Sequence, residues 1–480
     1  MNQSRNVDAC SMVGWWQPVL LSALAGGMAW GIRGQYGHET GAMIAGLLVS
    51  LVLVFLLCPK NISSLTMVRA AAWGTVAMGV GGSMTYGQTL GLTQNGPVIG
   101  NWEALRWGLL GCAIKGGIWI GFAGAFLGMG LSRIKYRPKE MWVLMLALIG
   151  AYYIGLSLMN RPYNPATGEV PHFYFSEYSY FYPDKEVSPR HESWGGLLFA
   201  LLTLIAYIRW QRKDRLAFNM ALWGILGGAL GFPGGQSLQA YHVWNPEVFD
   251  RGIWVELDQY MNWWNNMETT FGTIMGAVLG LGLWLNRHMI QPEVCDEEDN
   301  LPSWGEGSLL AIHLILLVLV EFSSVDAVDR AYDLGLIMIA IPVVAIVGGR
   351  FWPYLQILPL ILIPIAGKTL KNLSYDTQDV GVVLGWLLFV VIPLAITLLV
   401  AVLEIRKPET QRNGHAFIRW TLLLNAWIYF LLNYAFFRLP WPWAEWTGRT
   451  PNGIVFTICL FGITLAALFS RRREPQILNP

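Results

Sequence analysis

Long apolar runs recur along the whole 480-residue chain, and they constrain the fold more than any other feature of the sequence. The clearest runs lie at 42–58, 141–158, 196–208, 308–320, 380–403 and 454–469. A helix of roughly 20 mainly apolar residues crosses a bilayer, and helices are one of the few structures that satisfy their own backbone there. Charged residues make up only 13% of the chain, against roughly 25% in soluble domains. The sequence therefore predicts an all-α polytopic integral membrane protein, with the lipid bilayer as its main partner.

The number and direction of the spans follow from the same runs and from the loops between them. Fourteen apolar segments can be distinguished, four of them short or interrupted, so we expect 12–14 transmembrane helices. One predicted side carries 20 basic and 12 acidic residues, and the other carries 11 basic and 19 acidic residues. Because cytoplasmic loops are enriched in Lys and Arg, both termini are expected in the cytoplasm, at a bacterial-type inner or plasma membrane.

The chain has no separate soluble part, so residues 1–480 are expected to form a single transmembrane domain. Two long extracytoplasmic loops are predicted at 159–194 and 232–260, and an acidic cytoplasmic loop at 287–305. The first loop is rich in Tyr and Phe. Such aromatic residues could cap a binding site, or they could lie in the aromatic belt at the membrane surface.

Glycine-rich words repeat along the sequence and predict internal repeats. GGMAWGIRGQ (26–35) aligns without gaps to GGALGFPGGQ (227–236), and GGSMTYGQTLG (81–91) shares the Gly-Gln pair. AGKTLKN (366–372) is a weaker copy with Lys368 in place of the glutamine. All four lie on the predicted outer face, which indicates parallel repeats with broken glycine-rich helices. The alternative is that these glycines only pack helices closely.

The end of the first copy and the residues just after it form a short polar insert with three ionisable residues, Arg33, His38 and Glu39. Broken apolar segments at equivalent repeat positions point to the binding site of a transporter. Arg33 offers a planar fork for a carboxylate or phosphate, and His38 titrates near physiological pH. We therefore expect Arg33 to orient a substrate, and the adjacent His38 and Glu39 to act together on a proton.

Further candidates have polar side chains at repeat positions or within apolar sequence. Glutamines offer a donor and an acceptor to neutral polar groups, and an ionisable residue within a span is a functional candidate by default. Lys115 is such a residue, and we expect it to face a crevice. The predicted substrate-binding residues are Arg33, Gln35, His38, Glu39, Gln88, Lys115, Gln236 and His242.

These patterns favour a secondary transporter for a small polar or anionic, possibly sugar-like solute. The alternative is a membrane-embedded enzyme with an extracytoplasmic site, of the glycosyl- or acyl-transferase type, acting on a lipid-linked or carbohydrate substrate. The 24 tryptophans and the aromatic loops favour the enzyme, but no catalytic nucleophile and base can be assigned. The sequence has no P-loop, GxSxG, HxxH or HExxH motif, so we expect no cofactor, no metal and no nucleic-acid partner.

Overall fold

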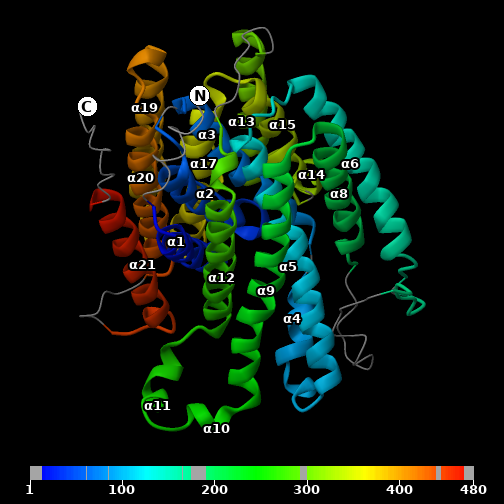
Figure 1. Cartoon of the computed structure of the whole chain (residues 1–480). Helices are drawn as coiled ribbons and strands as arrows, with labels where there is room; N and C mark the ends of the chain where they lie inside the picture. Colours follow the sequence, from blue (N-terminus) through cyan, green and yellow to red (C-terminus); the bar gives the residue numbers. More distant parts are fainter. Residues whose placement is uncertain are drawn as a thin grey trace, which may run out of the picture.

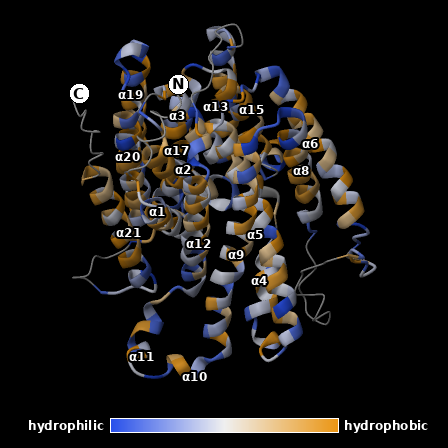
Figure 2. Ribbon diagram, in the orientation of Figure 1, coloured by the Kyte–Doolittle hydropathy of each residue, from blue (hydrophilic) through white to orange (hydrophobic). Residues whose placement is uncertain are grey.

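The computed structural model describes residues 13–438 and 445–469, except 61, 85, 165, 174–190, 292–299 and 334. In this part of the chain the secondary structure is helical, apart from one isolated bridge between Asn164 and Glu169 (Figure 1). Eleven helices of the described residues are long and apolar enough to cross a membrane, or up to 12 if the bent pair α14 (Asp326–Asp333) and α15 (Leu336–Gly348) is one span. Apolar residues dominate these helices (Figure 2). The predicted all-α, multi-pass membrane fold is confirmed.

The helices of the first half alternate between long straight segments and short turns of other helix types. They are α1 (Trp16–Arg33), η2 (Gly37–Gly41), α2 (Ala42–Leu57), α3 (Ser64–Val76), η3 (Ala77–Ser83), α4 (Gly87–Gln94), η4 (Gly96–Val98), α5 (Trp102–Leu131), α6 (Pro138–Met159), α8 (Trp194–Ala206), η5 (Tyr207–Arg212) and α9 (Arg215–Trp244).

The second half begins with short helices beyond α9 and continues with the remaining long ones. They are α10 (Pro246–Phe249), α11 (Trp254–Leu257), η6 (Asp258–Tyr260), α12 (Trp263–Leu285), η7 (Arg287–Met289), α13 (Ser303–Phe322), α14, α15, α16 (Trp352–Leu355), η9 (Gln356–Leu360), α17 (Ile361–Leu370), η10 (Lys371–Asp376), α18 (Val382–Gly385), η11 (Trp386–Val391), α19 (Ile392–Arg406), η12 (Glu409–Gln411), α20 (Gly414–Phe436) and α21 (Thr450–Phe469).

The count of 11 or up to 12 spans is at or below the lower end of the predicted 12–14. The expected first and third spans are present as helices but do not pass as spans. Helix α1 has only 18 residues and ends on the buried Arg33. Helix α3 has 13 residues and passes into the 3₁₀ segment η3 instead of continuing. Glycine and charge lower the hydropathy of α1, and the change of helix type ends α3 early.

Four antiparallel helices, α1, α12, α9 and α5, pack through glycines. A Cβ atom on Gly228 of α9 would lie 1.9 Å from the carbonyl oxygen of Gly116 on α5. A Cβ atom on Gly272 of α12 would lie 2.1 Å from the carbonyl oxygen of Gly26 on α1. The backbones therefore touch, which is how small residues hold helices together in lipid, where no hydrophobic force drives association.

The segment GGALGFPGGQ does not break its helix, contrary to the prediction. Helix α9 runs unbroken through Pro233 to Trp244, so the loop expected from residue 232 begins only after Trp244. Gly231 and Gly235 face α12, where added Cβ atoms would meet Phe271 and the carbonyl oxygen of Met267. Here the glycines serve close helix packing, and neighbouring helices allow proline to remain inside a helix.

The polar insert after α1 is a tight turn. Helix α1 ends at Arg33, Gly37 has φ +87°, and the π-helical turn η2 leads into α2. Only glycine adopts a positive φ without strain, so Gly37 is required for this reversal.

The first and last described helices run in opposite directions. Gly31 and Leu24 of α1 lie against Phe456 and Gly462 of α21, respectively. The start of α1 and the end of α21 are therefore on the same side, which the charge bias predicts to be cytoplasmic. Much of the predicted loops 159–194 and 287–305 lies outside the described residues, because 174–190 and 292–299 are not described. The basic run 471–473 is also outside them.

Candidate functional site

Arg33 lies in a buried ion pair between α1 and α12. Its Nη2 atom is 2.9 Å from Oε1 of Glu268, and the two side chains are 3% and 2% exposed. The same Nη2 donates to the hydroxyl of Tyr86, and the guanidinium lies over the rings of Trp30 and Tyr86, 5.2 Å and 5.4 Å from their centroids. One nitrogen of the fork that the sequence assigns to a substrate is thus engaged by the protein itself.

The short helix α4 and the residue before it collect three of the predicted side chains. Tyr86 contacts Arg33, Thr89 accepts a hydrogen bond from Nζ of Lys115 at 2.8 Å, and Thr93 accepts one from Nε2 of Gln236 at 2.6 Å. Gln88 lies on α4 itself, and its Oε1 atom is buried with no hydrogen-bond partner among the described residues. We call this group the α4 cluster: Arg33, Tyr86, Gln88, Thr89, Thr93, Lys115, Gln236 and Glu268.

The sequence suggests that Lys115 faces an open crevice, but in the structure its side chain is enclosed by the protein. Its Nζ atom lies 2.6 Å from Oε1 of Glu192, and both side chains are 2% exposed. Glu192 precedes α8, so this pair joins the middle of α5 to the start of another helix. Burial, and to a lesser degree Arg161, lowers the pKa of His191 beside it. Two charges can be enclosed here because each neutralises the other.

A second group, which we call the Lys368 cluster, lies next to the turn η2. Lys368 of α17 donates to the Tyr332 hydroxyl at 3.1 Å and to the Thr40 hydroxyl at 3.4 Å. Glu321 of α13 places Oε1 3.6 Å from Nζ of Lys368. Glu39 belongs here too, because its Oε2 and Nζ of Lys368 both lie within 4 Å of the position of a Cβ on Gly37.

His38 and Glu39 have different neighbours, so their joint action on a proton stays a prediction. His38 Nδ1 lies 3.5 Å from Nη1 of Arg33, and its ring meets Tyr86 edge-on at 4.6 Å. Glu39, which is 6% exposed, lies near Lys368. Successive residues of a helical turn point in different directions, so neighbours in sequence do not face each other. The insert therefore connects the two clusters.

A cavity of about 480 Å³ opens beside the Lys368 cluster. Its volume falls in the range of small-molecule sites, roughly 300–1,000 Å³. Four carboxylates face two lysines in its lining, so negative charge is in excess. Gln35 is among the lining residues, but Gln88 and Gln236 are not, so the three glutamines do not share this cavity. The charged and amide residues of the lining are Gln35, Glu321, Asp329, Asp333, Lys368, Lys371, Asn372 and Asp376.

His242 lies apart from both clusters, near the end of α9. Its Nε2 atom is 2.9 Å from Oδ1 of Asp258, and its ring stacks on Trp263 with centroids 4.1 Å apart. The residues that sequence reasoning missed are the partners: Glu268, Tyr86, Glu192 and Tyr332. Glu192 lies in a predicted loop just before α8, and Glu268 lies in the second turn of α12, so neither stands within an apolar run. The sequence signal that could have identified these carboxylates is an acidic residue placed directly before a long apolar stretch.

Among the described residues, no group of three or more His, Cys, Asp or Glu side chains is arranged to hold a metal ion. No protein-family model, curated protein or solved structure matches the chain.

Proposed function

We propose that this protein is a secondary transporter of a small polar solute, embedded in a bacterial-type inner or plasma membrane with its termini in the cytoplasm. The observation that carries the proposal is the cavity beside Lys368, which lies against a turn bearing the buried carboxylate of Glu39. Buried charge within spans is costly and typically marks a solute or proton pathway. The charge bias of the loops supports the orientation.

The charges that line the cavity favour amine-bearing and neutral polar solutes over anions. The excess of carboxylates attracts an amino group, and the Lys368 ammonium and the amide of Gln35 can bind hydroxyl or carbonyl oxygens. Arg33 is already paired with Glu268, so it is not available to an anionic substrate. We therefore propose a neutral, zwitterionic or amine-bearing polar solute in place of the anion considered from the sequence.

Glu39 is proposed as the group that couples transport to protons. It lies on a turn that touches both clusters, with Arg33 and His38 on one side and Lys368 on the other. Gain or loss of a proton by this carboxylate changes the charge balance around Lys368, and a change in charge balance can bias the packing of a turn.

We further propose that the glycine-rich segments are parallel repeats. The alignment of 26–35 with 227–236 without gaps supports this, and two contacts join neighbouring copies. Lys368, in the copy 366–372, approaches the carbonyl oxygen of Tyr36 just after the copy 26–35, at 3.4 Å. Gln236, in the copy 227–236, bonds Thr93 just after the copy 81–91, at 2.6 Å. If the copies are equivalent, Gln236→Ala and Lys368→Met should both reduce solute uptake.

The test is uptake into liposomes that contain the purified protein, with a panel of labelled amines, zwitterions, sugars and carboxylates. Two assays separate binding from coupling: uptake driven by an imposed pH gradient, and exchange of solute without a gradient. Glu39→Gln should lose gradient-driven uptake by more than tenfold while keeping exchange. Lys368→Met should lose both.

Matched controls are Glu256→Gln and Lys60→Met, which remove the same charges from exposed positions outside the cavity. Both should transport like the parent protein. Transport of carboxylates alone would contradict the charge argument, and normal gradient-driven uptake by Glu39→Gln would contradict the coupling role.

The His242–Asp258 pair favours a second candidate, a membrane-embedded enzyme. A carboxylate that accepts a hydrogen bond from imidazole orients the ring and raises its basicity, as in a general base. The pair lies next to the short helices α10 and α11, where Val255 and Ile253 are exposed and could meet a lipid-linked substrate. If this candidate is right, His242→Ala should abolish turnover of a lipid-linked sugar or acyl donor. If transport is the function, the same variant should leave uptake unchanged.

A further inference from the structure

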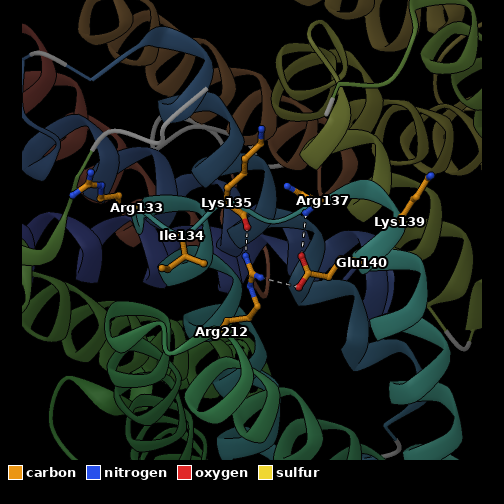
Figure 3. Close-up of a pocket in the computed structure, with 7 residues that line it drawn as sticks. All are labelled: Arg133, Ile134, Lys135, Arg137, Lys139, Glu140 and Arg212. Carbon is orange, nitrogen blue, oxygen red and sulfur yellow. Dashed lines mark hydrogen bonds and ion pairs between the residues drawn. The ribbon is translucent and has the colours of Figure 1, made fainter. Parts of the chain in front are cut away.

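The connection between α5 and α6 displays a row of basic side chains at the end of the bundle opposite α10 and α11. In residues 133–137 the basic residues stand at every second position, as expected for extended backbone whose side chains alternate between two faces, and Lys139 follows in the first turn of α6. Figure 3 shows Arg133, Lys135, Arg137 and Lys139 pointing to one side of this segment, with Ile134 on the other side. The alternation of basic residues along the sequence therefore places these side chains on one side of the segment.

Buried hydrogen bonds fix this segment to the start of α9. The hydroxyls of Ser132 and Tyr136 donate to Oδ2 of Asp214 at 2.5 Å and 2.8 Å, and the backbone N–H of Ala217 donates to Oδ1 at 3.0 Å. Burial raises the pKa of Asp214, and these hydrogen bonds act against that rise. These hydrogen bonds hold the basic segment in a fixed position against the start of α9.

The row lines an open cavity of about 930 Å³ together with Ile134, Arg212 and Glu140. Glu140 is the single acid of this lining and is already engaged. Its Oε1 lies 3.3 Å from Nη1 of Arg212 and accepts a hydrogen bond from the Tyr207 hydroxyl at 2.5 Å. Five basic residues against one acid leave the cavity with an excess of four positive charges.

An apolar groove of about 600 Å³ adjoins this cavity, and Glu140 lines both. The groove lies between α6 and the continuous helix formed by α8 and η5. Trp210 and Val143, at its edge, are 75% and 68% exposed and face the surroundings of the bundle. Its other lining residues are Leu144, Ala147, Thr203, Ala206, Tyr207 and Gln211.

We propose that this composite site binds an anionic phospholipid, with the phosphate in the basic cavity and one acyl chain in the groove. Basic pockets between transmembrane helices near a membrane surface are suited to anionic headgroups. A soluble anion would use the basic cavity but would gain nothing from the groove, whereas each buried methylene of an acyl chain adds to binding. The adjoining groove therefore selects a lipid over free phosphate.

The test uses the purified full-length protein in detergent, titrated with phosphatidylglycerol, phosphatidylcholine or inorganic phosphate. Arg133→Gln/Arg137→Gln should weaken phosphatidylglycerol binding about 30-fold, from about 1 kcal/mol for each basic residue. The control Lys60→Gln/Arg406→Gln removes two exposed charges outside this lining and should change the Kd less than threefold.

A second pair of variants tests whether the groove binds an acyl chain. Ala147→Trp fills the groove and should weaken phosphatidylglycerol binding more than fivefold, whereas Leu146→Trp, on the same helix but outside the lining, should not. Equal affinity for both phospholipids, or an unchanged Kd in Arg133→Gln/Arg137→Gln, would overturn the proposal. Inorganic phosphate that competes at similar concentration, with no effect of Ala147→Trp, would show that the cavity serves a free anion and that the lipid assignment is wrong.

Discussion

The buried pair of Arg33 and Glu268 gives the sharpest quantitative prediction. At 2.9 Å and an effective dielectric of about 20, two unit charges attract by roughly 6 kcal/mol, and several kcal/mol of desolvation for each ion offset this. The pair as a whole is therefore near neutral for stability. Removing one partner is different, because the other charge is left buried without compensation, at a cost of about 3–5 kcal/mol.

The perturbation is a double-mutant cycle of Arg33→Gln, Glu268→Gln and the combined variant. The loss of stability in Glu268→Gln is expected at the lower end of that range, because an amide oxygen can still accept a hydrogen bond from Arg33. Arg33→Gln is expected at the upper end, since it also removes the hydrogen bond to Tyr86 and the contact with the ring of Trp30. The combined variant should be more stable than Arg33→Gln alone, with a coupling energy of at least about 2 kcal/mol.

The assay is reversible unfolding of the purified protein in mixed micelles with increasing SDS, followed by circular dichroism. A coupling of 2 kcal/mol corresponds to about a 30-fold change in the folded-to-unfolded ratio. If the two single effects add within about 0.5 kcal/mol, the charges do not interact and the buried ion pair is refuted. The same variants assayed for uptake separate a structural role of Arg33 from a direct role in solute binding.

Two further predictions concern packing and topology. Gly228→Ala should lower stability by about 1–3 kcal/mol or more, because its Cβ would meet a backbone carbonyl oxygen at 1.9 Å. The control Gly150→Ala, whose Cβ would meet nothing within 4 Å, should be neutral or stabilising. Thermal unfolding of the two variants distinguishes these outcomes. A cysteine at the exposed Glu247 should react with an impermeant thiol reagent on intact cells, and one at the exposed Lys213 only after permeabilisation. The reverse pattern would invert the predicted orientation.

The fold class was predictable because it depends on composition and on apolar run length. Helices α2, α6 and α21 follow directly from the apolar runs 42–58, 141–158 and 454–469. Helix α1 shows where this reasoning weakens. Its glycines and Arg33 lower its hydropathy, and only packing against α12 and α21 explains why it is buried. The continuous helix through Pro233 could not be predicted, because it depends on the neighbouring helices.

The candidate site was predictable only in part, because its partners are distant in sequence. Arg33 and Glu268 are 235 residues apart, and nothing in either local sequence indicates the pairing. Arg33 and Lys115 were found because each is a cation in apolar sequence. Their carboxylates were missed because they lie next to loops. His38 and Glu39 have different neighbours, because successive residues along a helical turn point in different directions, so their joint action on a proton stays a prediction.

Gly34, in the glycine-rich segment 26–35, makes room for the buried ion pair of Arg33 and Glu268. A Cβ on Gly34 would lie 2.7 Å from Oε2 of Glu268, so the missing side chain leaves room for the carboxylate beside Arg33. The backbone at Gly34 has φ −51°, which alanine also adopts, so Gly34→Ala should act only by displacing that carboxylate. We expect a stability loss of about 1–3 kcal/mol that largely disappears in the background Glu268→Ala, where no carboxylate remains to be displaced. An equal loss in both backgrounds would show that Gly34 is needed for the turn itself, and that the glycine does not serve the ion pair.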